Sequence, residues 1–237
     1  MDRIWMESAK DRRKFLDRMV FSLDIKHAKR CAQYEKLLRD RNRLLKDNIA
    51  DSSWYLAIEK EMANLGFQID NCRREFIEKL NTALTEKNHY FPRIKLNLKE
   101  KPIENKEVFF EHLIDQRGQD LLSGRTNYGP HTDDLNGFYL EKEIDTKYCS
   151  TGEQKLSLIS IILSNAKLIK EQHNTSPILL LDEITAHLDE VRKENLFSEL
   201  LSLESQFFIS GTERGVYNSL SAKAKFLELD VRKKFLA

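Results

Sequence analysis

The chain has 237 residues, of which 41% are hydrophobic and 32% charged, with only 8 Gly and 4 Pro. This balance favours a helix-rich globular protein with a sizeable core and excludes collagen-like, linker-like and disordered chains. No apolar run approaches the length of about 18 residues that a membrane span needs, and the N-terminus lacks the apolar region of a signal peptide. Three widely separated cysteines form neither a disulfide framework nor a CxxC metal site, so we expect a reducing cytoplasm.

Charge is unevenly spread, although the formal net charge is only +1. Residues 1–50 hold 14 Lys and Arg against 8 Asp and Glu, a net charge of +6, so the remainder carries −5. A basic arm of this kind suits nucleic-acid phosphates, and a solvated helix face of mixed charge is an equally good interpretation of the composition. The candidate DNA contacts of this arm are Lys26, Lys29, Arg30, Arg39 and Arg43.

The first 90 residues have the pattern of long helices. Apolar residues recur among Lys and Arg over 11–47, and a seam with steps of four and three runs over 58–84. Gly66 lies within this seam, at a cost in helix propensity of about 1 kcal/mol relative to Ala. A short turn at 51–53, which offers Ser as an N-cap, joins the two helices. The sequence therefore predicts an antiparallel helical arm over residues 1–90.

The pattern changes after Pro92, where apolar and polar residues alternate over 94–99 and predict a strand with one buried face. Helices and strands then alternate, which predicts an α/β head over residues 91–237. The expected helices cover 106–122, 152–172 and 189–203, and the expected strands cover 137–140, 177–181, 206–210 and 225–229.

The sharpest feature is the apolar run Ile178–Leu181, which Asp182 and Glu183 follow directly. A continuous apolar run indicates a strand buried on both faces of a parallel sheet, and such sheets bind ligands at the carboxyl ends of their strands. Asp182 is placed to hold Mg²⁺, directly or through water, and Glu183 to orient and polarise an attacking water. The alternative interpretation is a strand that ends in two exposed acids without a function.

A second feature is the helix start Ser-Thr-Gly-Glu-Gln-Lys, just upstream of the acidic strand. A capping box is made there either by Thr151 with Gln154 or by Ser150 with Glu153. Gly152 leaves the amides of the first turn uncovered, so this helix N-terminus is a candidate site for phosphate oxygens. A well-capped helix without any ligand is the alternative.

Order and spacing make the motifs specific in combination. The helix start, the later Asp-Glu strand and the turn at 186–189 resemble the signature helix, the Walker B strand and the D-loop of an ABC-type ATPase head. The variant Ser-Thr-Gly-Glu-Gln-Lys resembles the RecF family of bacterial DNA-repair ATPases, as do segment 11–17 and the loop 129–135, in which Thr132 stands where the family usually has Arg. This resemblance covers nearly the whole chain and implies a partial ABC-type ATPase head, an α/β fold, with an α-helical hairpin arm.

The resemblance also implies chemistry. ATP and Mg²⁺ would be the cofactors, with Glu183 as the catalytic residue and Asp182 as the metal ligand. The residues implied to contact nucleotide are Ser150, Thr151, Gly152, Gln154, Asp182 and Asp189. Two heads would sandwich ATP as a homodimer that binds single-stranded or gapped DNA. The implied role is recombinase loading at single-strand gaps in recombinational repair and the SOS response, with RecO and RecR as partners and no membrane.

One family motif is absent from these 237 residues. No G-x-x-x-x-G-K-[ST] occurs, so the sequence supplies no loop of amides for the β- and γ-phosphates. In the family this loop precedes every matched segment, so we expect the chain to correspond to the C-terminal two-thirds of a RecF protein and to be inactive as an ATPase alone. The alternative hypothesis is a truncated, catalytically inactive remnant or an interaction module that needs a separate P-loop piece.

Overall fold

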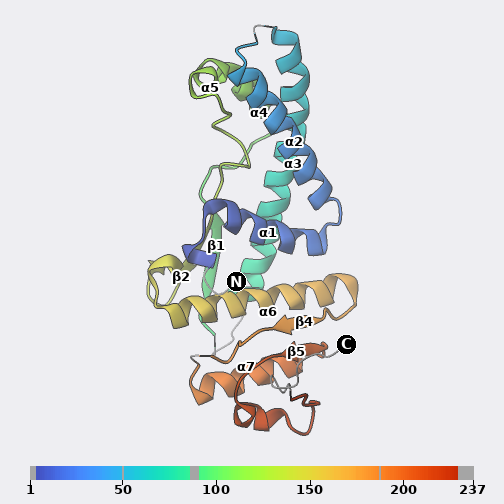
Figure 1. Ribbon diagram of the computed structural model, residues 1–237, viewed down its shortest axis with the longest axis vertical. Coiled ribbons are helices and arrows are strands. Elements are labelled where there is room, and N and C mark those ends of the chain that lie inside the picture. Colours follow the sequence, from blue (N-terminus) through green and yellow to red (C-terminus); the bar gives the residue numbers. More distant parts are fainter. Residues whose placement is uncertain (1–3, 50, 86–90, 187, 229–237) are drawn as a thin grey trace, which may run out of the picture. The chain divides into compact units, whose positions relative to one another are not determined.

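The computed structural model describes residues 4–49, 51–85, 91–186 and 188–228 (Figure 1). The chain divides into two compact units, 1–175 and 176–237. The expected boundary between arm and head, near residue 90, lies inside the first unit and stays a prediction. No helix of the described residues is long and apolar enough to cross a membrane.

The first unit combines long helices with a small sheet. Its elements are α1 (Ala9–Leu23), α2 (His27–Lys46), α3 (Ser52–Thr85), β1 (Ile94–Leu98), α4 (Lys106–Asp115), α5 (Arg117–Ser123), β2 (Leu135–Tyr139), β3 (Ile144–Asp145) and α6 (Thr151–His173). Helices α2 and α3 pack side by side as the expected hairpin (Figure 1).

The single helix expected over 11–47 is in fact two helices. Asp24 ends α1, and its carboxylate accepts a hydrogen bond from the amide of Lys26 at 3.0 Å, which turns the chain before α2 begins. A short-range bond of Asp to the backbone is a common way to leave a helix. Because neither Gly nor Pro marks this turn, the apolar pattern alone did not reveal it.

Helix α3 is continuous and serves two hydrophobic cores. Its N-terminal half packs with α2 and α4 around Met62 and Phe109, and its C-terminal half packs with α1, β1 and α6 around Leu80. Gly66 does not interrupt the helix. A Cβ atom at this position would lie 2.4 Å from Phe109 Cε1, so the missing side chain makes room for the aromatic ring.

The sheet of the first unit is antiparallel, with the strand order β1-β2-β3. Ile94 pairs with Tyr139 and Leu98 with Leu135. Alternate residues of β1 are buried, as the period of two predicts. The short β3 was not expected, and the helix expected over 106–122 is split into α4 and α5 at Gln116.

The second unit has the strand-helix-strand order that the sequence predicts. Its elements are β4 (Leu179–Leu181), α7 (Glu190–Ser202), β5 (Phe207–Ile209) and a 3₁₀ helix, η3 (Arg214–Leu220). The two strands pair in parallel, with Leu181 opposite Ile209. Both strands therefore end at the same edge of the sheet.

Two expectations for this unit were wrong. The run before Asp182 is not buried on both faces, because Leu179 and Leu181 are buried while Ile178 and Leu180 are 61% and 78% exposed. Buried and exposed residues thus alternate along β4, which is the pattern of a strand with one buried face. Of the strand expected over 225–229, residues 225–228 form no regular structure and residue 229 lies outside the described residues.

Candidate functional site

Asp182 and Glu183 directly follow β4, as predicted, and both residues are exposed. Ser210, the first residue after β5, donates a hydrogen bond from Oγ to Asp182 Oδ1. Within the part of the chain that the structure describes, Asp182 Oδ2 has no hydrogen-bond partner. A free carboxylate oxygen at this edge suits Mg²⁺, which takes oxygen ligands, often from one or two carboxylates, and keeps several waters.

The backbone of Glu183 is left-handed, with φ at 44°. This conformation costs a residue other than Gly about 1–3 kcal/mol, and such strain gathers at functional sites. The amide of Glu183 donates to Ser210 Oγ at 3.1 Å, which helps to hold the strained conformation. The chain thus changes direction at the residue expected to be catalytic.

A cavity of about 240 Å³, which Glu183 but not Asp182 lines, lies between the segments that follow β4 and β5. Tyr217 forms one wall; its hydroxyl lies 3.0 Å from Thr185 Oγ1 and donates to the carbonyl of Ser210 at 3.1 Å. Sites for whole small molecules usually measure about 300–1,000 Å³. This cavity is therefore smaller than a site for a whole nucleotide, which needs further surface.

At the start of α6 the structure forms the capping box of Ser150 with Glu153. The amide and hydroxyl of Ser150 donate to Glu153 Oε2 at 3.0 and 2.9 Å. Lys142 Nζ lies 2.5 Å from Glu153 Oε1, and its hydrogen bond lowers the pKa of this carboxyl. Ser150, expected to contact nucleotide, is thus used within the cap.

The other nucleotide candidates differ in how open they are. Thr151 is exposed, and a Cβ at Gly152 would stand in open space, more than 4 Å from any atom outside the adjoining residues and the nearby backbone of the helix. Gln154 is buried, and its Nε2 donates to two carbonyls of the preceding turn, each at 3.1 Å. Asp189 caps α7 by accepting from the amide of Arg192 at 2.9 Å. Thr151 and Gly152 are therefore the positions of the α6 start that a ligand can reach.

The basic residues of α2 and of its N-cap, Lys26, are also not equivalent. Lys26, Lys29 and Arg39 are exposed, and Arg43 is 85% exposed at 3.6 Å from Asp47. Arg30 instead forms a close ion pair with Asp24 and is only 20% exposed. Arg30 is therefore the least available of the five DNA-binding candidates.

The loop that resembles the family motif, residues 129–135, binds neighbouring basic side chains. Arg12 forms two hydrogen bonds to Asp134 at 2.7 and 2.9 Å, and Lys99 lies 3.0 Å from the same carboxylate. Thr132, where the family usually has Arg, donates to the carbonyl of Gly129 at 2.8 Å and closes a local turn. These contacts give the loop a structural role between α1 and the sheet.

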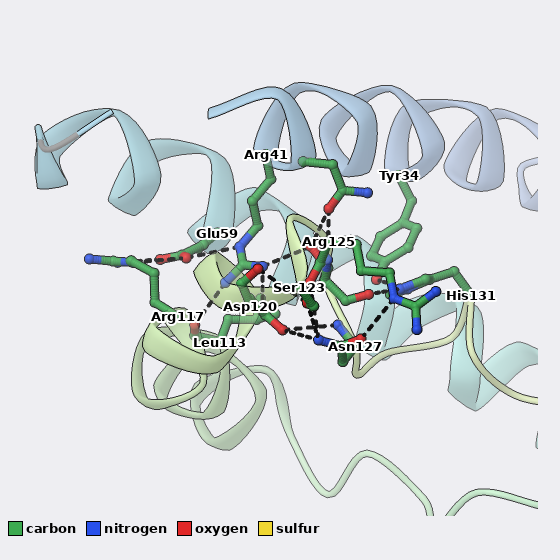
Figure 2. Close-up of polar contacts among 12 residues, drawn as sticks. Tyr34, Arg41, Glu59, Leu113, Arg117, Asp120, Ser123, Arg125, Asn127 and His131 are labelled. Carbon is green, nitrogen blue, oxygen red and sulfur yellow. Dashed lines mark hydrogen bonds and ion pairs between the residues drawn. The ribbon is translucent and has the colours of Figure 1, made fainter. Parts of the chain in front are cut away.

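A buried polar cluster lies beside this loop, near the C-terminal end of α2 and the N-terminal end of α3 (Figure 2). Arg41 is fully buried and donates to Glu59 at 3.0 Å, to Asp120 at 2.6 Å, to Thr126 at 2.7 Å and to a backbone carbonyl at 3.0 Å. Arg117 donates to the second oxygen of Glu59 at 2.6 Å. This cluster connects α2 and α3 to α5, and no local sequence pattern predicts it because its members lie far apart in the chain.

Asp17, His27 and Cys31 form the group of possible metal ligands that the described residues contain, with donor atoms within 4.8 Å of one another. Arg73, however, already binds both oxygens of Asp17 at 2.8 and 2.9 Å. Burial opposes ionisation of Asp17, but hydrogen bonds from His27 and Arg73 outweigh it and lower its pKa to about 2. An ion pair therefore accounts for this group without a metal.

The chain is similar in sequence to known proteins. No family model matches it. It is 38% identical to the DNA replication and repair protein RecF of Rhizobium meliloti (strain 1021) over 96% of this chain and 63% of that protein. The corresponding values are 40%, 97% and 64% for RecF of Mesorhizobium japonicum, and 41%, 97% and 62% for RecF of Brucella abortus (strain 2308). The chain thus spans a little less than two thirds of the length of these relatives.

Solved structures agree with the sequence relatives. The structure of the recombination mediator protein RecF with ATP superposes with a TM-score of 0.74 at 25% identity, over 90% of this chain and 60% of that one. The structure of RecF with ATPrS gives a TM-score of 0.72 at 24% identity, over 88% and 59%. The expected fold, a partial ATPase head with a helical arm, is therefore confirmed. Over nearly its whole length this chain is homologous to the DNA replication and repair protein RecF, which confirms the resemblance that its motifs carry.

Proposed function

We propose that the chain acts as a RecF-like DNA replication and repair protein, an ATP-dependent DNA-binding head that dimerises around ATP and aids recombinase loading at single-strand gaps. The observation that carries this proposal is the identity of 38–41% to RecF proteins over nearly the whole chain. A cytoplasmic location and the partners RecO and RecR belong to the same proposal. The neighbouring structures are of RecF in the RecFOR pathway.

The proposed chemistry uses the edge of the second unit and the start of α6. Asp182 would hold Mg²⁺ through its free oxygen, and a cation bound there would supply positive charge for the transferred phosphoryl group. Glu183 orients the attacking water. Thr151 and the amides near Gly152 contact the γ-phosphate of nucleotide held by the other copy, because a helix N-terminus favours negative charge. Asp189 orders the turn between the acidic pair and α7.

For DNA we propose the exposed side of α2. Lys29 and Arg39 are exposed on this helix and Lys26 is exposed at its N-cap, all within the segment that carries the positive excess. Lys and Arg that neutralise phosphates release counterions, so affinity falls as salt rises. The logarithm of the binding constant falls with the logarithm of the salt concentration, with a slope of about 0.9 per phosphate contact. The binding is therefore expected to be strongly salt-dependent.

The test compares two triple variants of the 237-residue chain by fluorescence anisotropy with a gapped duplex at several salt concentrations. Lys26→Glu, Lys29→Glu and Arg39→Glu together should weaken binding and lower the salt slope by about 2 to 3. The matched control, Lys95→Glu, Lys101→Glu and Lys106→Glu, makes the same charge change at exposed positions outside α2 and should bind more tightly than the α2 variant. Equal affinity and equal slope for the α2 variant and the unchanged chain would exclude α2 as the DNA contact.

A second candidate function is an interaction module that needs a separate P-loop piece. The observation that favours it is the uncovered face of the β4-β5 sheet, where Ile178, Leu180 and Phe208 are 61%, 78% and 56% exposed. A two-stranded parallel sheet with one bare face requires another polypeptide layer. The test co-expresses the chain with a piece that carries G-x-x-x-x-G-K-[ST], if the adjacent reading frame encodes one. ATP turnover that Glu183→Gln abolishes would favour the ATP-dependent function. Co-purification of the two pieces without turnover would favour the inactive module.

A further inference from the structure

Ser210 directly follows β5, as Asp182 directly follows β4. The parallel register pairs Leu181 with Ile209, so the next residue of each strand, Asp182 and Ser210, emerges at the same edge. The amide of Ser210 also donates to the carbonyl of Leu181 at 3.0 Å, which extends the pairing by one bond. Sheet geometry therefore fixes the backbone of Ser210 beside the acidic pair.

The hydroxyl of Ser210 contacts both acidic residues at once. Oγ donates to Asp182 Oδ1, and the same oxygen accepts from the amide of Glu183 at 3.1 Å. A hydroxyl has one proton and two lone pairs, so the proton goes to the carboxylate and a lone pair receives the amide. One side chain thus orients the carboxylate of Asp182, leaves Oδ2 free and supports the left-handed backbone of Glu183.

Tyr217 holds Ser210 from the other side. The Tyr217 hydroxyl donates to the carbonyl of Ser210 at 3.1 Å and lies 3.0 Å from Thr185 Oγ1, so it links the segments after β4 and β5. A Cβ at Gly211 would lie 2.0 Å from the Tyr217 hydroxyl oxygen, which explains why the residue after Ser210 has no side chain. Ser210 is therefore supported by its own strand and by Tyr217.

We propose that Ser210 is the positioning residue for the Asp182-Glu183 pair. Its hydroxyl determines which carboxylate oxygen of Asp182 binds a divalent cation, and it fixes the backbone conformation from which the Glu183 side chain extends. This inference rests on the proposed function, because it takes Asp182 as the cation ligand. Removing a group that hydrogen-bonds to a metal ligand and orients it usually lowers metal affinity by about 10–100-fold.

The test uses the 237-residue chain and Mn²⁺ in place of Mg²⁺, with free Mn²⁺ measured by electron paramagnetic resonance. Ser210→Ala should weaken Mn²⁺ binding about tenfold, whereas Ser210→Thr keeps the hydroxyl and should restore it. Ser205→Ala is the matched control, since Ser205 Oγ bonds only to the carbonyl of Leu203, at 3.3 Å, among the described residues. Asp182→Asn should abolish the binding.

A second readout follows the geometry directly. Hydrogen exchange of the Glu183 amide should accelerate in Ser210→Ala and stay slow in Ser210→Thr, because the amide loses its acceptor only in the first variant. If Ser210→Ala does not fold by circular dichroism, Ser210→Cys replaces it, since a thiol has similar size and is a weak donor. The same loss of affinity is expected there.

The outcomes separate the two proposals. Unchanged Mn²⁺ affinity in folded Ser210→Ala or Ser210→Cys, with binding abolished by Asp182→Asn, would overturn the role of Ser210 and leave the proposed function standing. Mn²⁺ binding that Asp182→Asn does not reduce, or the lack of any binding by the unchanged chain, would overturn the metal assignment on which the inference rests.

Discussion

Replacing Arg41 with Met removes the centre of the buried cluster while nearly keeping the volume of the side chain. Arg41 is fully buried and donates four hydrogen bonds, two of them to the carboxylates of Glu59 and Asp120 (Figure 2). Glu59 keeps its contact with Arg117, but Asp120 keeps only neutral donors from Asn127. Arg41→Met therefore leaves one buried carboxylate without a cation.

The expected size of this effect follows from burial. Removing one partner of a buried ion pair costs about 3–5 kcal/mol, because the other charge stays buried and unpaired. Since a domain is stable by only about 5–15 kcal/mol, the first unit should lose a large part of its free energy of unfolding. In Arg41→Met with Asp120→Asn the unpaired charge is gone, so the loss should be smaller than the sum of the single losses.

Urea unfolding followed by tryptophan fluorescence measures this loss. Both tryptophans of the chain, Trp5 and Trp54, lie in the first unit, so the signal reports on that unit. The matched control is Arg43→Met, two residues along α2, whose side chain is 85% exposed. It should change the free energy of unfolding by less than about 0.5 kcal/mol. A loss below about 1 kcal/mol for Arg41→Met, or equal losses for both variants, would refute the reasoning that Arg41 compensates the buried carboxylate of Asp120.

Three further predictions concern Asp17, Gly211 and the nucleotide site. The pKa of Asp17 is lowered to about 2 in the folded protein from 3.8, so its contribution of about 2 kcal/mol is present above pH 4 and is lost as pH falls through 2. Asp17→Asn should flatten acid unfolding in this range, and an unchanged acid transition would contradict the assignment. Gly211→Ala should destabilise the second unit by about 1–3 kcal/mol through its clash with Tyr217, seen as faster hydrogen exchange of the Ser210 amide; unchanged exchange would contradict the close contact. The 237-residue chain should show no ATP turnover, and turnover that Glu183→Gln abolishes would contradict this. In a preparation that forms ATP-dependent dimers, Thr151→Arg should prevent dimerisation, measured by light scattering, without preventing nucleotide binding to each monomer.

Local patterns in the sequence were sufficient for several elements. The seam over 58–84 predicted α3, and the alternation over 94–99 predicted β1 with its buried face. The Asp-Glu pair after an apolar run marked the end of β4, and the helix expected over 189–203 is α7. These features depend on residues within a few positions of one another, whose period and capping chemistry can be read directly from the chain.

Other features depend on residues that meet only in the folded chain. The sequence left two capping boxes open at α6, and the structure formed the one with Ser150 and Glu153, where Lys142 reaches the Glu153 carboxylate. The exposure of Leu180 depends on which layers cover the sheet, which its apolar character does not reveal.

The Arg41 cluster and the contact between Ser210 and Asp182 show most clearly why the sequence does not reveal such features. Arg41 and Asp120 are separated by 79 residues, and Ser210 and Asp182 by 28, so no local pattern joins them. Hydrophobic period and capping act within a turn or two of chain, whereas the choice of partner for a buried charge is made by the packing of distant elements. The sequence by itself therefore determined most helical segments, most strands and the acidic pair, whereas the breaks within 11–47 and 106–122 and the side chain that holds the acidic pair in place were decided only by the tertiary structure.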